Sequence, residues 1–305
     1  MTGAQLFFQQ CANGLTLGAI YALIALGYTM VYGVIQLINF AHGEIFMVGA
    51  YLALSVLLLL GAAQPAGAAL FGTLLLCAAV SMAASGLLGL GIERLAYRPL
   101  RKAQRLATLI TAIGVSFFLQ NAMMLLYGAT DRKFPVIIPS IRWEVAGVTI
   151  TSLQALIWVS SGVLMVGLQI LVMKTRLGKA MRATAEDPKA CLLLGIPVNH
   201  VVAVTFVIGS ALAAVGGMLF GLTYNTINFH DGYLTGIKAF TAAVLGGIGN
   251  IPGAMVGGIV LGILEGLGAG YLSSQWKNVF ALVVLVGILL FKPTGLLGER
   301  LADRA

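Results

Sequence analysis

Charged residues are scarce in this chain. They make up 9% of its 305 residues, while 59% are hydrophobic; an average soluble domain carries roughly a quarter charged residues. So few charges cannot cover a surface that faces water, which excludes a soluble globular protein. A bilayer core takes about 20 apolar residues per helix, so the chain has room for roughly eight to ten spans. The composition predicts an all-α integral membrane protein with about eight transmembrane helices in a single domain, residues 1–305.

Signatures of catalysis and of metal binding are missing too. The chain has no GxxxxGKS or GxxxxGKT phosphate loop, no HExxH, no GxSxG and no CxxC. His42, His200 and His230 are far apart, and the three cysteines are an odd number that gives no disulfide framework. We therefore expect neither an enzyme nor a bound metal or cofactor. The chain cannot bind ATP through a Walker motif of its own.

Basic residues gather in short clusters between the apolar runs. Residues 94–105 and 174–189 each carry five of them, a pattern that favours membrane orientation over nucleic-acid binding. Because basic loops stay on the cytoplasmic side, we expect both clusters in the cytoplasm, and residues 128–152 and the N-terminus outside. Residues 1–10 contain no Lys or Arg, so the basic start of a cleavable signal is missing and we expect the N-terminus to be retained.

The seventh of eight apolar segments, residues 238–270, is too long for one simple span. It contains GGIGNIPG, residues 246–253, and Gly and Pro inside a membrane element are typical of a broken or re-entrant helix. A break would also keep the basic C-terminal tail in the cytoplasm, whereas a single crossing would place it outside. Gly246, Gly247 and Gly249 are therefore candidates for the translocation pathway.

Glycines repeat at four-residue spacing through and beyond this break. This spacing leaves one face of a helix without side chains, so that the backbone of another helix can approach it closely. This glycine stripe favours helix packing, within the subunit or against a second one; a direct role in a pathway is the alternative. The repeats are Gly249, Gly253 and Gly257, then Gly258, Gly262, Gly266 and Gly270.

The second apolar segment, residues 35–60, contains the polar residues Asn39, His42 and Glu44. Ionisable groups inside a membrane are costly and by default indicate function. Glu44 lies about ten residues, or about 15 Å, inside the cytoplasmic end of this segment. Two interpretations stay open: a translocation pathway, or polar groups near a helix end that reach water.

The fifth connection, residues 174–199, has basic flanks and an Ala-rich amphipathic centre. These features favour a short helix against the membrane surface, with Asp187 and Pro188 suited to a helix start or a turn. Composition alone fits a plain cytoplasmic loop as well as a docking element.

The same connection is similar to the coupling loop of ABC importer permeases that serve branched-chain amino acids, ribose and related solutes. The resemblance implies that this loop docks on a separate ATPase. The matching positions that it implies for coupling are Gly178, Arg182, Ala183, Glu186, Asp187 and Gly195.

Further segments resemble the H-type permease subunits of high-affinity systems for leucine, isoleucine and valine. They are residues 14–44, 92–101, 109–121 and 238–258. The resemblance implies a multi-pass subunit of the bacterial inner membrane with a second homologous permease, two cytoplasmic ATP-binding subunits and a periplasmic amino-acid-binding protein.

Two other functions stay open at this point. A urea or short-chain amide permease is one, because such permeases carry an element like NxAHGE, residues 39–44. The other is an ion-coupled secondary transporter in which Glu44 or Glu265 is the coupling carboxylate.

Overall fold

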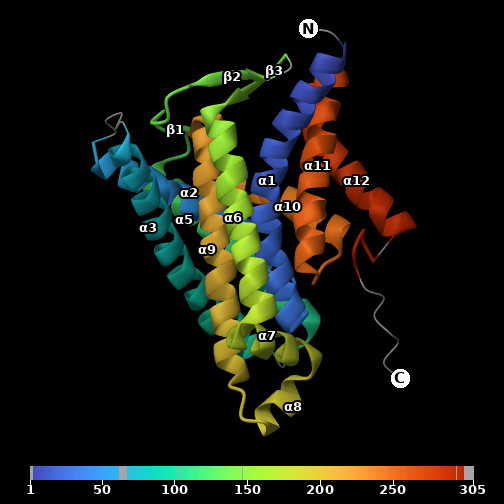
Figure 1. Ribbon diagram of the computed structural model, residues 1–305. Helices are drawn as coiled ribbons and strands as arrows, with labels where there is room; N and C mark the ends of the chain where they lie inside the picture. Colours follow the sequence, from blue (N-terminus) through green and yellow to red (C-terminus); the bar gives the residue numbers. More distant parts are fainter. Residues whose placement is uncertain (1–2, 62–66, 102, 146, 293, 299–305) are drawn as a thin grey trace.

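The computed structural model describes residues 3–61, 67–101, 103–145, 147–292 and 294–298 as a bundle of long helices (Figure 1). Seven described helices are long and apolar enough to cross a membrane, which confirms the expected helical membrane architecture. Helices suit lipid because they satisfy their own backbone hydrogen bonds. The seven are α1 (Gly3–Ile35), α2 (His42–Leu59), α3 (Ala68–Ile92), α5 (Arg105–Tyr127), α6 (Ser152–Lys174), α9 (Val198–Tyr224) and α11 (Ile251–Tyr271).

Shorter elements complete the path of the chain. A π-helical turn (Glu93–Tyr97) and α4 (Arg98–Leu100) extend α3, and a 3-10 turn (Ser274–Trp276) precedes the apolar α12 (Lys277–Phe291). The remaining short helices are α7 (Arg176–Glu186), α8 (Pro188–Leu193) and α10 (Asp231–Gly246).

Strands lie at one end of the bundle, and α7 and α8 lie at the other (Figure 1). We call these the strand end and the basic end. β1 (Arg132–Lys133) pairs antiparallel with β4 (Thr226–Ile227), and β2 (Arg142–Val145) pairs antiparallel with β3 (Val148–Thr151). These short strands were not predicted, since composition indicated only a loop over residues 128–152.

The long apolar segment is broken, as its glycines and proline predicted. α10 and α11 form a helical hairpin whose turn contains Gly247 at φ +108° and Gly249 at φ +96°, a region that favours glycine. Asn250 caps α11, because its Oδ1 accepts a hydrogen bond from Gly253 N at 3.0 Å. The hairpin begins at Asp231, seven residues before the start of the apolar segment.

Glycines bring α1 and α11 into close contact within this one chain. A Cβ at Gly258 would lie 2.5 Å from Ala22 Cα, and one at Gly266 would lie 2.8 Å from Gly14 Cα, where real Cβ atoms stay beyond 3.0 Å. A Cβ at Gly262 would overlap the backbone of Gly18. The glycine stripe therefore packs helices inside the subunit, one of the two packing roles expected for it.

The second apolar segment starts later than predicted. α2 begins at His42, and residues 36–39 form an irregular connection after α1. The expectation that Asn39 belongs to this apolar helix was wrong. Gln36 has φ +54°, a left-handed conformation that ends a helix and that hydrophobicity alone does not reveal.

We predict that Gly262→Ala destabilises the bundle. The added methyl group meets the backbone of Gly18, which cannot move without separating α1 from α11, so the free energy of unfolding should fall by about 2 kcal/mol or more. Thermal unfolding in detergent measures the effect. Gly167→Ala in α6 is the matched control, since a Cβ there meets open space; equal stability of the two variants would contradict the packing role.

Candidate functional site

The connection at the basic end folds into two short helices with defined caps. Thr175 Oγ1 accepts from Gly178 N at 3.1 Å at the start of α7. At the start of α8, Asp187 Oδ1 accepts from the backbone N–H groups of Lys189 (2.8 Å) and Ala190 (3.1 Å), and Pro188 takes the first helical position. Such caps fix where a helix begins. The helix start predicted at Asp187 and Pro188 is therefore confirmed.

The residues expected to dock an ATPase differ in where their side chains lie. Gly178 packs against the carbonyl groups of Leu171 and Val172, and Arg182 Nη1 donates to the carbonyl of Val172. These two residues fold α7 back against the end of α6. Glu186 and Asp187 are exposed, Ala183 is half-buried, and Gly195 has φ +78° where the chain turns after α8.

An exposed apolar run lies at the far tip of the basic end, and the sequence prediction missed it. Leu192, Leu193 and Leu194, at the end of α8, are 61%, 90% and 79% exposed, and Figure 1 shows α8 at this tip. An exposed apolar patch indicates an interaction surface. The signal in the sequence was the run LLLG, residues 192–195, in a connection with basic flanks, but its exposure depends on α8 ending at Leu193.

A cavity of about 100 Å³ lies between this connection and the membrane helices. α7, the last turns of α1 and the turn of the α10–α11 hairpin all contribute to its wall. α7 thus lies close to both elements. The lining residues include Thr29, Gly33, Met181, Arg182, Gly249 and Ile251.

Asn39, His42 and Glu44 are buried together where α2 begins, with exposures of 1–2%. Asn39 Oδ1 accepts from the Tyr97 hydroxyl at 2.9 Å and from Ala41 N at 3.1 Å. Asn39 thereby fixes the start of α2 against the π-helical turn after α3.

Glu44 lies deep in the bundle. Its Oε1 accepts from Ser116 Oγ at 3.1 Å, and Ser116 is eleven residues from both ends of α5, which is about 16 Å along the helix. Oε2 has no hydrogen-bond partner among the described residues. Glu44 is therefore buried in the interior of the bundle, beside the middle of α5, although it belongs to the first turn of α2.

His42 packs at the same depth without a polar partner for Nε2 among the described residues. Its ring meets the Tyr28 ring edge to face at 4.8 Å between centroids. Gly27 and Gly209 leave room for the ring on the α1 and α9 sides. The structure thus brings His42 and Glu44 into one buried region.

Gly246, Gly247 and Gly249 lie apart from these polar groups, at the hairpin turn near the basic end. The last described residues pack on this turn, where Leu296 N donates to the carbonyl of Leu245 at 2.8 Å and Leu297 N donates to that of Gly246 at 3.0 Å. A Cβ at Gly247 would lie 2.6 Å from Gly298 Cα. Gly246 and Gly247 allow close packing of the turn, whereas Gly249 supplies a positive φ.

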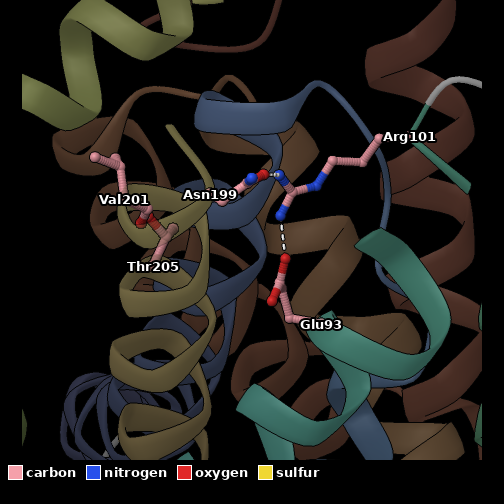
Figure 2. A network of polar contacts seen from close by, with 5 residues as sticks. All are labelled: Glu93, Arg101, Asn199, Val201 and Thr205. Carbon is pink, nitrogen blue, oxygen red and sulfur yellow. Dashed lines mark hydrogen bonds and ion pairs between the residues drawn. The ribbon is translucent and has the colours of Figure 1, made fainter. Parts of the chain in front are cut away.

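A polar network joins the two basic connections (Figure 2). Arg101 forms an ion pair with Glu93, which is 1% exposed, and donates from Nη1 to Asn199 Oδ1 at 2.8 Å. Burial lowers the pKa of the Arg101 guanidinium, whereas Glu93 acts in the opposite direction. Asn199 lies at the start of α9, six residues beyond α8. The link therefore connects the α3–α5 connection to the segment that follows α8.

Seven described helices that are long and apolar enough to cross a bilayer, together with the broken α10–α11 hairpin, are the architecture of a multi-pass membrane protein. Residues 10–289 match the family model described as branched-chain amino acid transport system / permease component. This chain belongs to that family.

Named relatives match along nearly the whole chain. The high-affinity branched-chain amino acid transport system permease protein BraD of Pseudomonas aeruginosa is 49% identical over 96% of both chains. The corresponding LivH proteins of Escherichia coli K12 and Salmonella typhimurium are 47% and 46% identical, also over 96% of both chains. No solved structure matches this chain.

Proposed function

We propose that this chain is the membrane-spanning permease subunit of an ABC importer that carries leucine, isoleucine, valine or related hydrophobic amino acids across the bacterial inner membrane. The observation that carries the proposal is the 46–49% identity, over 96% of both chains, to permease proteins of high-affinity branched-chain amino acid transport systems. The partners are a second homologous permease, two cytoplasmic ATP-binding subunits and a periplasmic amino-acid-binding protein.

The α7–α8 pair, within residues 174–199, is the element that couples this chain to the ATPases. Leu192, Leu193 and Leu194 supply the apolar centre of the docking surface, with exposed Glu186 and Asp187 at its edge. A central apolar anchor with a polar rim is the usual arrangement of an interface. Arg182, Gly178, Ala183 and Gly195 hold the pair in shape.

ATP binding and hydrolysis on the partners then move α7 against α1 and the hairpin turn across the shared cavity. This movement shifts the population between inward-facing and outward-facing states, and that requires only differential binding of the partners to the two states. Asn39, His42, Glu44 and the glycines of the turn, Gly246, Gly247 and Gly249, belong to the elements that change position during translocation.

Uptake of labelled leucine tests the whole proposal. Vesicles with this chain, its permease and ATPase partners and the binding protein should accumulate leucine only when both ATP and the binding protein are present. Leucine uptake on an ion gradient alone would overturn the ABC assignment. ATP-dependent uptake of urea without leucine would keep the energy source and change the solute.

Leu193→Asp should uncouple the ATPases from this chain. The side chain is 90% exposed, so the bundle should fold normally, whereas a charge at the centre of the docking surface should weaken assembly about thirtyfold, or about 2 kcal/mol. Co-purification of the ATPases and binding-protein-stimulated ATP hydrolysis measure this. Val136→Asp, at an exposed apolar residue outside the basic end, is the control; unchanged coupling in Leu193→Asp refutes the docking surface.

Glu44→Gln should lower leucine uptake about tenfold with little change in thermal unfolding. Glutamine keeps the size of the side chain and can accept from Ser116, so only the buried charge is removed. Ser116→Ala, which removes only the hydrogen bond, is the comparison. Full uptake by both Glu44→Gln and Asn39→Ala would reduce these residues to helix packing.

A further inference from the structure

A polar cavity of about 220 Å³ lies near the strand end, separate from the residues considered for the pathway above. Its volume is below the range of about 300–1,000 Å³ for ligand pockets, so it suits a small solute. Four helices, α1, α9, α10 and α12, contribute to its wall. The lining residues include Tyr21, Phe220, Tyr224, Asp231, Lys238 and Asn278.

One wall of this cavity carries a buried ion pair. Lys238 Nζ lies 2.8 Å from Glu265 Oε1, and the Tyr21 hydroxyl donates to Glu265 Oε2 at 3.0 Å. Both oxygens of Glu265 are thereby occupied, and the residue is 1% exposed. The ion pair ties α10 to α11, and Tyr21 ties it to α1.

One N–H bond of the Lys238 ammonium group is available to a ligand in the cavity. An ammonium group has three N–H bonds; Lys238 directs one to Glu265 and a second to the Tyr21 hydroxyl at 3.4 Å. No third acceptor lies within hydrogen-bond distance among the described residues, and the side chain, which is 13% exposed, lines the cavity. A carboxylate in the cavity would accept this third hydrogen bond.

Asp231 supplies the opposite charge at the start of α10. Its Oδ2 accepts from Asn228 N at 2.7 Å, and Oδ1 has no hydrogen-bond partner among the described residues. Asp231 and Lys238 are seven residues apart, hence on one helix face with Cα atoms about 10 Å apart. Because helical side chains lean toward the N-terminus, the lysine side chain shortens this distance. A ligand with an ammonium and a carboxylate on one carbon can bridge the gap.

The rest of the wall combines polar residues, Thr226, Thr235 and Asn278, with an aromatic and aliphatic part. The rings of Phe220 and Tyr224 stack with centroids 4.4 Å apart, and Leu234 lies on the α10 side. Such a surface suits a branched aliphatic side chain, since burial of that chain from water is favourable. The cavity therefore offers one cation, one anion and a partly apolar wall.

We propose that this cavity binds the transported amino acid as a zwitterion, with its α-carboxylate on Lys238, its α-ammonium on Asp231 and its side chain against Phe220 and Tyr224. This inference rests on the proposed function and adds to it a solute site in the permease itself. An uncharged solute of the same size would leave the remaining N–H of Lys238 and the Oδ1 of Asp231 without a ligand partner, which disfavours its binding.

Protection from a thiol reagent tests the site without ATP. The assembled transporter in nanodiscs carries Asn278→Cys in a chain whose own Cys11, Cys77 and Cys191 are replaced by Ala. Millimolar leucine should slow labelling about fivefold or more. 4-Methylpentanoate, which lacks the ammonium, and 3-methylbutylamine, which lacks the carboxylate, should not. Val145→Cys on the exposed face of β2 should label at one rate in all cases.

Asp231→Asn and Tyr21→Phe probe the polar groups in the same assay. Asp231→Asn should abolish protection by leucine, and its matched control Glu144→Gln, an exposed acid on β2, should retain it. Tyr21→Phe should weaken protection, whereas Tyr233→Phe, an exposed phenol on α10, should not. Protection that survives Asp231→Asn, or equal protection by leucine and both analogues, overturns the zwitterion site.

Uptake in the complete transporter separates this inference from the proposed function. Asp231→Asn should lower leucine uptake about tenfold while ATP hydrolysis stimulated by the loaded binding protein persists. Uptake that needs ATP and the binding protein, together with no protection by leucine, refutes the cavity alone. Protection by leucine together with uptake that ignores ATP refutes the ABC assignment alone.

Discussion

Backbone contact between α1 and α11 determines where the polar groups of this bundle lie. Lipid chains are as apolar as leucine, so they give two helices no hydrophobic reason to associate, and packing of small residues takes that role. α11 approaches α1 so closely that a Cβ atom at Gly258, Gly262 or Gly266 would overlap the backbone of α1. The position of α10 is fixed in turn, because Lys238 of α10 is ion-paired to Glu265 of α11. The cavity beside Lys238 is therefore positioned by steric fit.

Local sequence patterns predicted those parts of the fold that a single residue type controls. Glycine and proline over residues 246–253 predicted the hairpin turn, and the positive φ angles of Gly247 and Gly249 explain why. Asp187 and Pro188 predicted a helix start for the same reason, since a cap depends on neighbours in the sequence. The burial of Glu44 was an open question, because its depth depends on which residue of α5 it meets.

Features that depend on distant parts of the chain were not predictable. The hydrogen bond from Arg182 to the end of α6 was not predicted, since no sequence rule gives the direction of a side chain in a helix that folds back. Lys238 and Glu265 are 27 residues apart and meet only because the hairpin is antiparallel. The exposed leucines of α8 depend equally on where that helix ends.

The link between Arg101 and Asn199 has a consequence for how force would pass through the subunit. α7 contacts α1 and lines one cavity with the hairpin turn, whereas the segment after α8 is hydrogen-bonded through Asn199 to the connection between α3 and α5. A load applied at α8 is thus shared between two anchor points on different groups of helices. A displacement of α8 would then move two groups of helices relative to each other. One group is reached through α7, and the other is reached through Asn199.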